Sequence, residues 1–112
     1  MTELINGIVY KIICKVNRDI VYVGSTTNTL KARFSKHKHS YNTKRSSILY
    51  KYFDKYGIDN FVIKPLLEIK VKTKQELRIH EQFYISTIQC INEKNAYLNF
   101  KEYQKKHYFE NI

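Results

Sequence analysis

The sequence predicts an α+β fold, in which a small three-stranded antiparallel β-sheet is flanked by helices in the order β-β-α-α-β-α. Three observations lead to this prediction. Short apolar runs rich in β-branched residues predict three strands. Longer stretches with apolar residues at helical spacing, each preceded by serine or threonine, predict three helices. A five-residue polar turn between the first two strands is typical of a β-hairpin.

The strands are expected where β-branched and apolar residues follow one another. The first is predicted for Gly7–Cys14, which reads GIVYKIIC, and the second for Ile20–Gly24, which reads IVYVG. The polar turn Lys15–Asp19 joins them. A third strand is predicted for Phe61–Ile69, where Pro65 lacks a backbone N–H and therefore indicates a sheet edge or a bulge.

The first two helices are expected at capping signals. One should begin within Ser25–Thr29, where small capping residues gather, and run to about His39. Ser46 is expected to cap the next, which reads SSILYKYFDKY and which Gly57 should end.

The last helix and the C-terminal part follow the third strand. Thr73–Glu76 has the form of a capping box and should open a helix that reaches about Ile88. Gln89–Asn95 is expected to be a loop, and Ala96–Phe100 a short extended segment. The tail Lys101–Ile112 is basic and aromatic, and its conformation is left open.

Length and composition indicate one globular domain. With 112 residues, 43% apolar and 27% charged, the chain can bury a single core. We expect the domain at residues 1–100, with the basic tail 101–112 packed on it or extended. Because no run of about 18 apolar residues and no signal peptide is present, we expect an intracellular protein with no membrane partner, located in the cytoplasm or, in a eukaryotic host or virus, in the nucleus or viral factory.

The charge balance points to a polyanionic partner. Twenty basic and ten acidic residues give a net charge of +10, and nucleic acid is the commonest intracellular polyanion. A solvated lysine-rich surface is the alternative, since 16 lysines against four arginines would also follow from an AT-rich genome. The cysteines Cys14 and Cys90 do not combine with the four histidines at zinc-binding spacing.

Glu81 interrupts the apolar face of the third predicted helix. That face is otherwise formed by Leu77, Tyr84, Ile85 and Ile88. A carboxylate among apolar residues is unfavourable unless it is paired or bound to a cation. Two readings stay open, namely a salt bridge to a nearby lysine or arginine and a ligand for Mg²⁺, which needs only one carboxylate besides water and phosphate.

The first predicted helix places two polar residues on its packed face. This face comprises Leu30, Arg33, Phe34, His37 and Tyr41. An arginine there can hold a phosphate through two hydrogen bonds. For His37 alone, a core histidine bonded to a backbone carbonyl is the favoured interpretation.

Two tyrosines are expected side by side in the hairpin. If Cys14 faces Ile20, Tyr22 pairs with Ile12 and lies diagonal to Tyr10 on the same face of the sheet. Taken alone, the pair is best explained by ordinary aromatic packing.

Together these residues resemble the GIY-YIG nuclease family, over residues 7–100. The segments that carry the resemblance are GIVYKI, VYVGST, the arginine nine residues after the glycine of the second motif, the histidine four residues later, HEQFY and YLNF. The residues that match the family pattern are Tyr10, Tyr22, Gly24, Arg33, His37, Glu81 and Asn99. Two departures are visible: Gly7 stands one place early in the first motif, and Arg45 replaces a second histidine of some phage homing enzymes.

The resemblance implies a metal-dependent endonuclease that hydrolyses DNA phosphodiester bonds. By this resemblance Tyr10 would be the general base, assisted by His37 or Tyr22, and which of Tyr10 and His37 accepts the proton stays open. Arg33 would hold the phosphate, and Glu81 would hold one Mg²⁺ or Mn²⁺ beside the leaving 3′-oxygen.

Three further residues are expected to contact substrate or to shape its site. Lys11, with Arg33 and the metal, would favour the phenolate form of Tyr10. Gly24 would let the backbone turn sharply into the helix beside the phosphate. Asn99 is expected to be structural or orienting.

Two other classes of function remain as alternatives. One is a catalytically inactive nucleic-acid-binding module with the same fold, and the other is a basic partner protein without a nucleic-acid role. No DNA-reading segment is visible, so specificity would be low, directed by DNA structure, or supplied by a homodimer or a protein partner.

Overall fold

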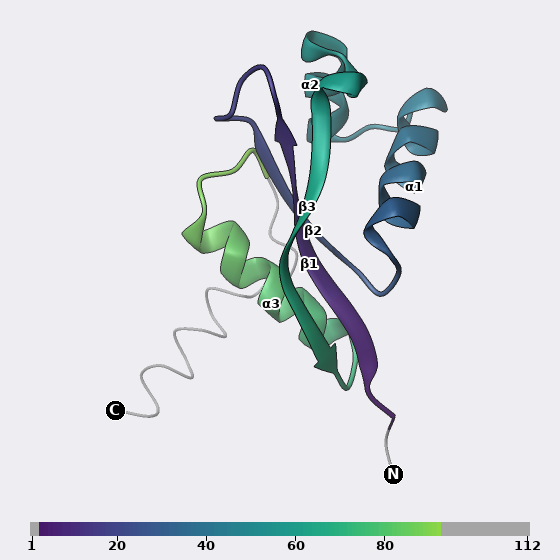
Figure 1. Cartoon of the computed structure of the whole chain (residues 1–112), viewed down its shortest axis with the longest axis vertical. Helices are drawn as coiled ribbons and strands as arrows, with labels where there is room; N and C mark the ends of the chain where they lie inside the picture. The colour runs from purple at the N-terminus through teal and green to yellow at the C-terminus, as the bar shows by residue number, and fades with distance from the viewer. Residues whose placement is uncertain (1–2, 93–112) are drawn as a thin grey trace.

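The computed structural model describes residues 3–92 and contains the predicted elements in the predicted order (Figure 1). The strands are β1 (Ile5–Cys14), β2 (Val21–Thr26) and β3 (Phe61–Val71). The helices are α1 (Leu30–Asn42), α2 (Ile48–Tyr56), the single-turn 3₁₀ helix η1 (Ile58–Asn60) and α3 (Lys74–Thr87). The expected extended segment Ala96–Phe100 and the tail Lys101–Ile112 lie outside the described residues.

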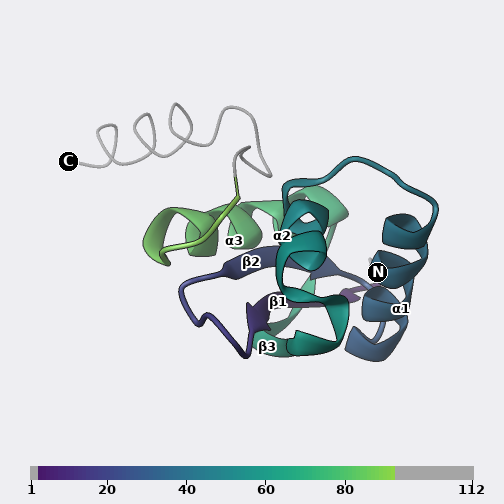
Figure 2. The same cartoon turned by 90° about the horizontal axis from the view of Figure 1, so that it is seen from above.

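The three strands form one antiparallel sheet in the order β2-β1-β3, which confirms the predicted α+β class. Helices α1 and α2 cover one face, and α3 covers the other (Figure 2). The central strand β1 is therefore enclosed on both faces and both edges, whereas β2 and β3 are edge strands. No helix within residues 3–92 is long and apolar enough to cross a membrane.

The hairpin has the register that the sequence predicts. Ile12 pairs with Tyr22, and Tyr10 pairs with Gly24. The backbone N–H of Cys14 donates to the carbonyl oxygen of Ile20 at 3.1 Å, which closes the turn. Tyr10 and Tyr22 consequently project from the same face of the sheet.

Pro65 lies both at a sheet edge and at a bulge, as its missing N–H predicts. Val9 pairs with Leu67 and Tyr10 pairs with Pro65, so Leu66 is an extra residue in the edge strand β3. The bulge lies beside Tyr10.

Alternation along β1 divides the core into two layers. Tyr10, Ile12 and Cys14 pack with α2 residues such as Leu49 and Phe53 on one face. On the other face, the strand residues Val9, Val23 and Val71 pack with Leu77 of α3. Sequence alternation thus decides which helix each strand residue contacts.

The helix caps agree with the sequence in type and differ from it in detail. Thr29 caps α1, and its hydroxyl accepts from the backbone N–H of Ala32 at 3.1 Å. The cap of α2 is Ser47 and not Ser46, because the Ser47 hydroxyl accepts from the Leu49 N–H at 3.3 Å. The expectation for Ser46 was one residue early, since adjacent serines give the same sequence signal.

The start of α3 is a variant of the predicted capping box. The Thr73 hydroxyl accepts from the Glu76 N–H at 3.1 Å, as expected. The Glu76 carboxylate, however, accepts from the N–H of Lys72 at 2.9 Å instead of that of Thr73. The cap therefore ties α3 to the end of β3.

Candidate active site

Tyr10 meets two residues of α1 through its hydroxyl. The ring is fully buried at the centre of the sheet. The Nε of Arg33 donates to the Tyr10 hydroxyl oxygen at 3.0 Å, and the same oxygen lies 2.9 Å from Nε2 of His37. Because Arg33 and His37 are one helical turn apart, α1 brings both to one phenol. The structure thus brings together three of the residues singled out in the sequence.

His37 lies in a cage of tyrosines instead of against a backbone carbonyl. It is buried, with its Nδ1 3.2 Å from the hydroxyl oxygen of Tyr50 on α2. The ring of Tyr22 meets its edge at a centroid distance of 5.8 Å. The expectation of a carbonyl partner was wrong because two phenol oxygens already satisfy the imidazole. Tyr50 had no sequence signal beyond being one of ten tyrosines.

Glu81 approaches from the other face of the sheet. The hydroxyl of Ser25, which follows Gly24 on the edge strand β2, donates to Oε1 of Glu81 at 2.5 Å. Within residues 3–92 Glu81 makes no ion pair, since Arg78 and Arg33 act on its charge only at longer range. The salt-bridge reading of Glu81 is therefore not supported by these residues.

Burial controls the protonation of Tyr10. It raises the pKa of the phenol well above its ordinary value, and the neighbouring charge and hydrogen bond of Arg33 only partly offset this. Burial, and then the negative charge of Glu81, likewise raise the pKa of Tyr22. Arg33 alone therefore does not favour a phenolate at Tyr10, because desolvation outweighs the arginine. The expectation concerned the site with a metal bound as well, and for that state it stays a prediction.

The pKa values of two other groups, His37 and Glu81, are also shifted. Burial, and then the positive charges of Arg33 and Lys36, lower the pKa of His37 from 6.5 to about 4, so its imidazole is neutral at pH 7. Burial raises the pKa of the Glu81 carboxyl, which the Ser25 hydrogen bond and the charges of Arg78 and Arg33 partly counter. A carboxylate held in this way is favoured by any added cation.

Lys11 does not lie beside the Tyr10 phenol. It follows Tyr10 in β1, so strand alternation directs its side chain to the opposite face, where it is paired with Val23 and Lys64. The charges that act on the Tyr10 phenol do not include Lys11. The prediction that Lys11 favours the phenolate form of Tyr10 is therefore wrong, because successive residues of a strand point to opposite faces of the sheet.

The reason for a glycine at position 24 differs from the one expected. Gly24 lies within β2, and the only glycine with a positive φ in residues 3–92 is Gly57, at 88°. A Cβ at Gly24 would overlap the Tyr10 hydroxyl and ring. Glycine is thus required by the close approach of the Tyr10 phenol and not by a sharp turn.

The expected role of Asn99 lies outside the described residues. Another asparagine, Asn92, hydrogen-bonds the edge of β2 and was missed. Its side-chain oxygen accepts from the N–H of Val23 at 3.0 Å, and its amide donates to the Val23 carbonyl at 2.8 Å. Asn92 thereby completes the outer edge of the strand that carries Gly24 and Ser25.

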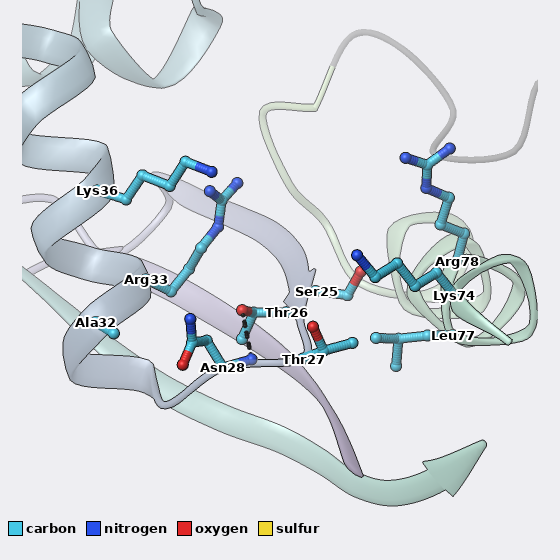
Figure 3. A pocket seen from close by; sticks show the side chains of 10 residues that line it. All are labelled: Ser25, Thr26, Thr27, Asn28, Ala32, Arg33, Lys36, Lys74, Leu77 and Arg78. Carbon is cyan, nitrogen blue, oxygen red and sulfur yellow. Dashed lines mark hydrogen bonds between the residues drawn. The ribbon is translucent and has the colours of Figure 1, made fainter. Parts of the chain in front are cut away.

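A cavity of about 440 Å³ opens between α1 and α3, at the end of β2 (Figure 3). Its cationic lining residues come from both helices and are Arg33, Lys36, Lys74 and Arg78. Hydroxyl and amide groups at the end of β2 and in the β2–α1 connection complete it, namely those of Ser25, Thr26, Thr27 and Asn28. Three of the four cations were not singled out in the sequence, where Lys36, Lys74 and Arg78 resemble any solvated helix lysine or arginine.

Beside this cavity, Glu81 is bonded by the lining residue Ser25 and offers one carboxylate for a divalent cation. Within residues 3–92, no three histidine, cysteine, aspartate or glutamate side chains gather as a metal site. The Ser25 hydroxyl bonds Oε1 of Glu81, and the described residues make no hydrogen bond to the other carboxylate oxygen. This donor set suits a cation such as Mg²⁺, which retains several waters and takes one or two carboxylates besides substrate phosphate.

Comparisons with known proteins identify the family and the fold. A model of the GIY-YIG catalytic domain matches residues 6–96. The catalytic domain of the intron endonuclease I-TevI, solved as a glutamate-to-alanine mutant, superposes with a TM-score of 0.68 and 26% identity, over 82% of this chain and 97% of that domain.

Two proteins of Invertebrate iridescent virus 6 are similar in sequence. The MSV199 domain-containing protein 146R is 35% identical over 86 residues, and the uncharacterized protein 019R is 36% identical over 90 residues. These alignments cover 77% and 80% of this chain, yet only 35% and 32% of the two relatives, so the chain spans about a third of their length. The family match extends over most of the sequence and includes Tyr10, Gly24, Arg33 and Glu81, and the chain therefore belongs to the GIY-YIG catalytic domain family.

Proposed function

We propose that the protein is a DNA endonuclease that hydrolyses phosphodiester bonds at the site formed by Tyr10, Arg33 and Glu81. The observation that carries the proposal is the cationic cavity, because it is lined by Arg33 of α1 and by Lys74 and Arg78 of α3. Two of its lining residues bond groups of perturbed pKa: Arg33 donates to the buried Tyr10 phenol, which lies beside the neutral imidazole of His37, and Ser25 donates to the Glu81 carboxylate, whose pKa is raised. Perturbed groups beside a pocket that suits the substrate are typical of active sites.

The cavity suits a phosphate backbone. Arg33 and Lys36 belong to α1, and Lys74 and Arg78 belong to α3 (Figure 3). A DNA strand bound between the two helices would therefore have positive charge on both sides. Hydroxyl and amide groups at the floor add donors for phosphate oxygens. Such contacts carry no sequence information, so we further propose that target choice comes from DNA structure, a homodimer or a protein partner.

Arg33 connects substrate binding to the Tyr10 phenol. In the free protein the guanidinium donates to the Tyr10 hydroxyl and also lines the cavity. A bound phosphate competes for this guanidinium, because an arginine forms its strongest hydrogen bonds with anions. Movement of Arg33 toward the phosphate would uncover the Tyr10 oxygen for the attacking water.

Tyr10 would act as a general base without a resting phenolate. Its oxygen has a lone pair that can accept a proton from the attacking water while its own proton leaves toward Nε2 of His37. The proton count is then balanced: one proton arrives at the phenol and one departs. A raised pKa of the phenol is compatible with this step, since the neutral form is the reactant.

Glu81 is the residue that would hold one Mg²⁺ or Mn²⁺, with the Ser25 hydroxyl orienting the carboxylate. When bound, such an ion lowers the charge on the phosphate and on the leaving 3′-oxygen. Arg33 contributes to the same end from the opposite helix by binding a phosphate oxygen.

Incubation with supercoiled plasmid tests the proposal. The protein should convert it to nicked or linear DNA with Mg²⁺ or Mn²⁺, and chelation of the ion should stop the reaction. An inactive binding module with the same fold would shift the plasmid in a gel without cutting it. A basic protein without a nucleic-acid role would do neither at physiological salt.

A further inference from the structure

His37 is held between two phenols, and the donors around it determine where its proton lies. The Nε of Arg33 can only donate, so the Tyr10 oxygen accepts that hydrogen bond. The single hydroxyl proton of Tyr10 is then left for Nε2 of His37, 2.9 Å away. A neutral imidazole that accepts at Nε2 carries its proton on Nδ1, which lies 3.2 Å from the hydroxyl oxygen of Tyr50.

We propose that Tyr50 is a positioning residue of the active site, which accepts the Nδ1–H of His37 and thereby keeps Nε2 ready to receive the Tyr10 proton. This inference rests on the proposed endonuclease function and goes beyond it, because Tyr50 lies on α2, outside the residues of the proposed site. The second nitrogen of a histidine generally selects its tautomer through the hydrogen bond that it makes.

Tyr50 also provides a way out for the proton. Burial and the charges of Arg33 and Lys36 disfavour a doubly protonated imidazole at His37. A proton that arrives at Nε2 can leave from Nδ1 to the Tyr50 oxygen as Tyr50 gives its own proton to solvent. Tyr50 lines a cavity of about 470 Å³ beside Arg45 and Asp54, so solvent can reach it there. One proton enters at Tyr10 and one leaves at Tyr50, and the tautomer of His37 must reset before the next turnover.

The packing of α2 fixes the Tyr50 ring for this role. The ring stacks on Phe53 at a centroid distance of 5.6 Å and meets Tyr41 edge-on at 6.0 Å. Phe53 is in the core, so the phenol is held by a buried neighbour instead of by solvent-exposed contacts. The Tyr41 hydroxyl, by contrast, donates to the Asp54 carboxylate at 2.6 Å and does not bond His37.

Tyr41 therefore offers a matched control. Tyr50→Phe removes the hydroxyl that faces His37, whereas Tyr41→Phe removes a hydroxyl at the same cavity with no bond to the imidazole. Both substitutions keep the ring packing, and thermal melting checks that each variant folds. The tautomer can be observed directly by ¹⁵N-detected NMR of the imidazole nitrogens in the protein alone.

We expect the wild-type protein and Tyr41→Phe to carry the His37 proton on Nδ1. Tyr50→Phe should shift it wholly or partly to Nε2. In the plasmid assay at saturating DNA, Tyr50→Phe should lower kcat by roughly 10²-fold, near the lower limit of what a general base contributes, with DNA affinity unchanged. Tyr41→Phe should cut at the wild-type rate.

Several results would overturn the proposal. One is a His37 proton on Nε2 in the wild-type protein. Another is a His37 tautomer that does not change in Tyr50→Phe, and a third is a Tyr50→Phe variant whose His37 tautomer changes while its kcat does not. A wild-type protein that cuts no DNA would refute the endonuclease function and with it the catalytic part of the proposal. The NMR comparison would still decide separately whether Tyr50 fixes the tautomer.

Discussion

The phenol of Tyr10 is enclosed by its own strand partner and by α1. Gly24 leaves the space for its ring, and Arg33 and His37 bond its hydroxyl. Removing only the oxygen keeps the ring that packs in the core. Tyr10→Phe should therefore melt near the wild-type temperature and lose roughly 10²- to 10⁴-fold in cutting rate. A variant that cuts at the wild-type rate would show that the phenol only packs.

The buried imidazole of His37 makes stability depend on pH. Its pKa is lowered from 6.5 to about 4, so the folded state favours the neutral ring, while the unfolded chain binds a proton below pH 6.5. The resulting stabilisation is present above pH 6.5 and is lost as the pH falls toward 4. It amounts to roughly 3 kcal/mol.

The measurement is the free energy of unfolding in urea at pH 7 and pH 4. The difference between the wild-type protein and His37→Gln should shrink on acidification by up to the roughly 3 kcal/mol involved. His39→Gln, at an exposed position of the same helix, should follow the wild-type protein at both pH values. An equal wild-type advantage over His37→Gln at both pH values would exclude a neutral buried imidazole.

For single residues, the face of the helix or strand on which a side chain lies could be predicted from the sequence. Contacts between side chains of different helices and strands could not. Helical spacing placed Arg33 and His37 on the packed face of α1, and strand pairing placed Tyr10 and Tyr22 on one face of the sheet. The partner of His37 is on α2, and no local pattern connects Tyr50 to it. Burial also outweighs the expected effect of Arg33 on the pKa of the Tyr10 phenol, because desolvation depends on the whole fold.

At the scale of elements, α2 begins at one of two adjacent serines. Ser47 has the extended backbone of an N-cap and bonds the Leu49 N–H, whereas Ser46 is exposed. Ser47→Ala should lower the free energy of unfolding by about 1 kcal/mol, and Ser46→Ala should leave it almost unchanged. Urea unfolding of both variants checks this, and equal effects would contradict the assignment of the cap.

Strands and helices were predictable because each has its own period and its own end signals. The predicted strands Gly7–Cys14 and Phe61–Ile69 lie within β1 and β3, which each extend by two residues at one end. Those extra residues pair with each other, Ile5 with Val71 and Asn6 with Lys70. Pairing between distant strands lengthens them beyond the local pattern, which is why their ends were missed.

Across the whole molecule, positively charged side chains lie both at the cavity between α1 and α3 and at the far edge of the sheet. Lys74 and Arg78 line the cationic cavity, while Lys64 and Lys70 are exposed on β3, at the opposite edge of the sheet from β2. The double variants Lys74→Gln/Arg78→Gln and Lys64→Gln/Lys70→Gln remove the same charge. A comparison of the two separates contacts within the cavity from the general field of the protein.

The cavity variant should bind DNA more weakly, and the slope of log affinity against log salt should fall by roughly 2, as the loss of two phosphate contacts requires. The β3 variant should keep a slope close to the wild-type value. Both slopes can be measured by titrating labelled duplex DNA with each variant at salt concentrations from about 50 to about 200 mM, because counterion release has a large effect on affinity in this range. Identical slopes for the two variants would place the DNA elsewhere.

In the proposed function, Glu81 is the only protein ligand of the catalytic ion. In Glu81→Gln the amide oxygen can still accept from the Ser25 hydroxyl, and no ion pair within residues 3–92 is broken. The fold should therefore persist, and DNA binding should survive or tighten because a negative charge near the phosphates is removed. Cutting should collapse, because a neutral amide holds a divalent cation poorly.

The most direct measurement combines a thermal melt with a plasmid-nicking assay in Mg²⁺ on one preparation of Glu81→Gln. A melting temperature close to that of the wild-type protein, together with intact DNA binding and no nicking, is the predicted result. A well-folded Glu81→Gln that nicks plasmid at the wild-type rate would contradict it, and with it the active site formed by Tyr10, Arg33 and Glu81.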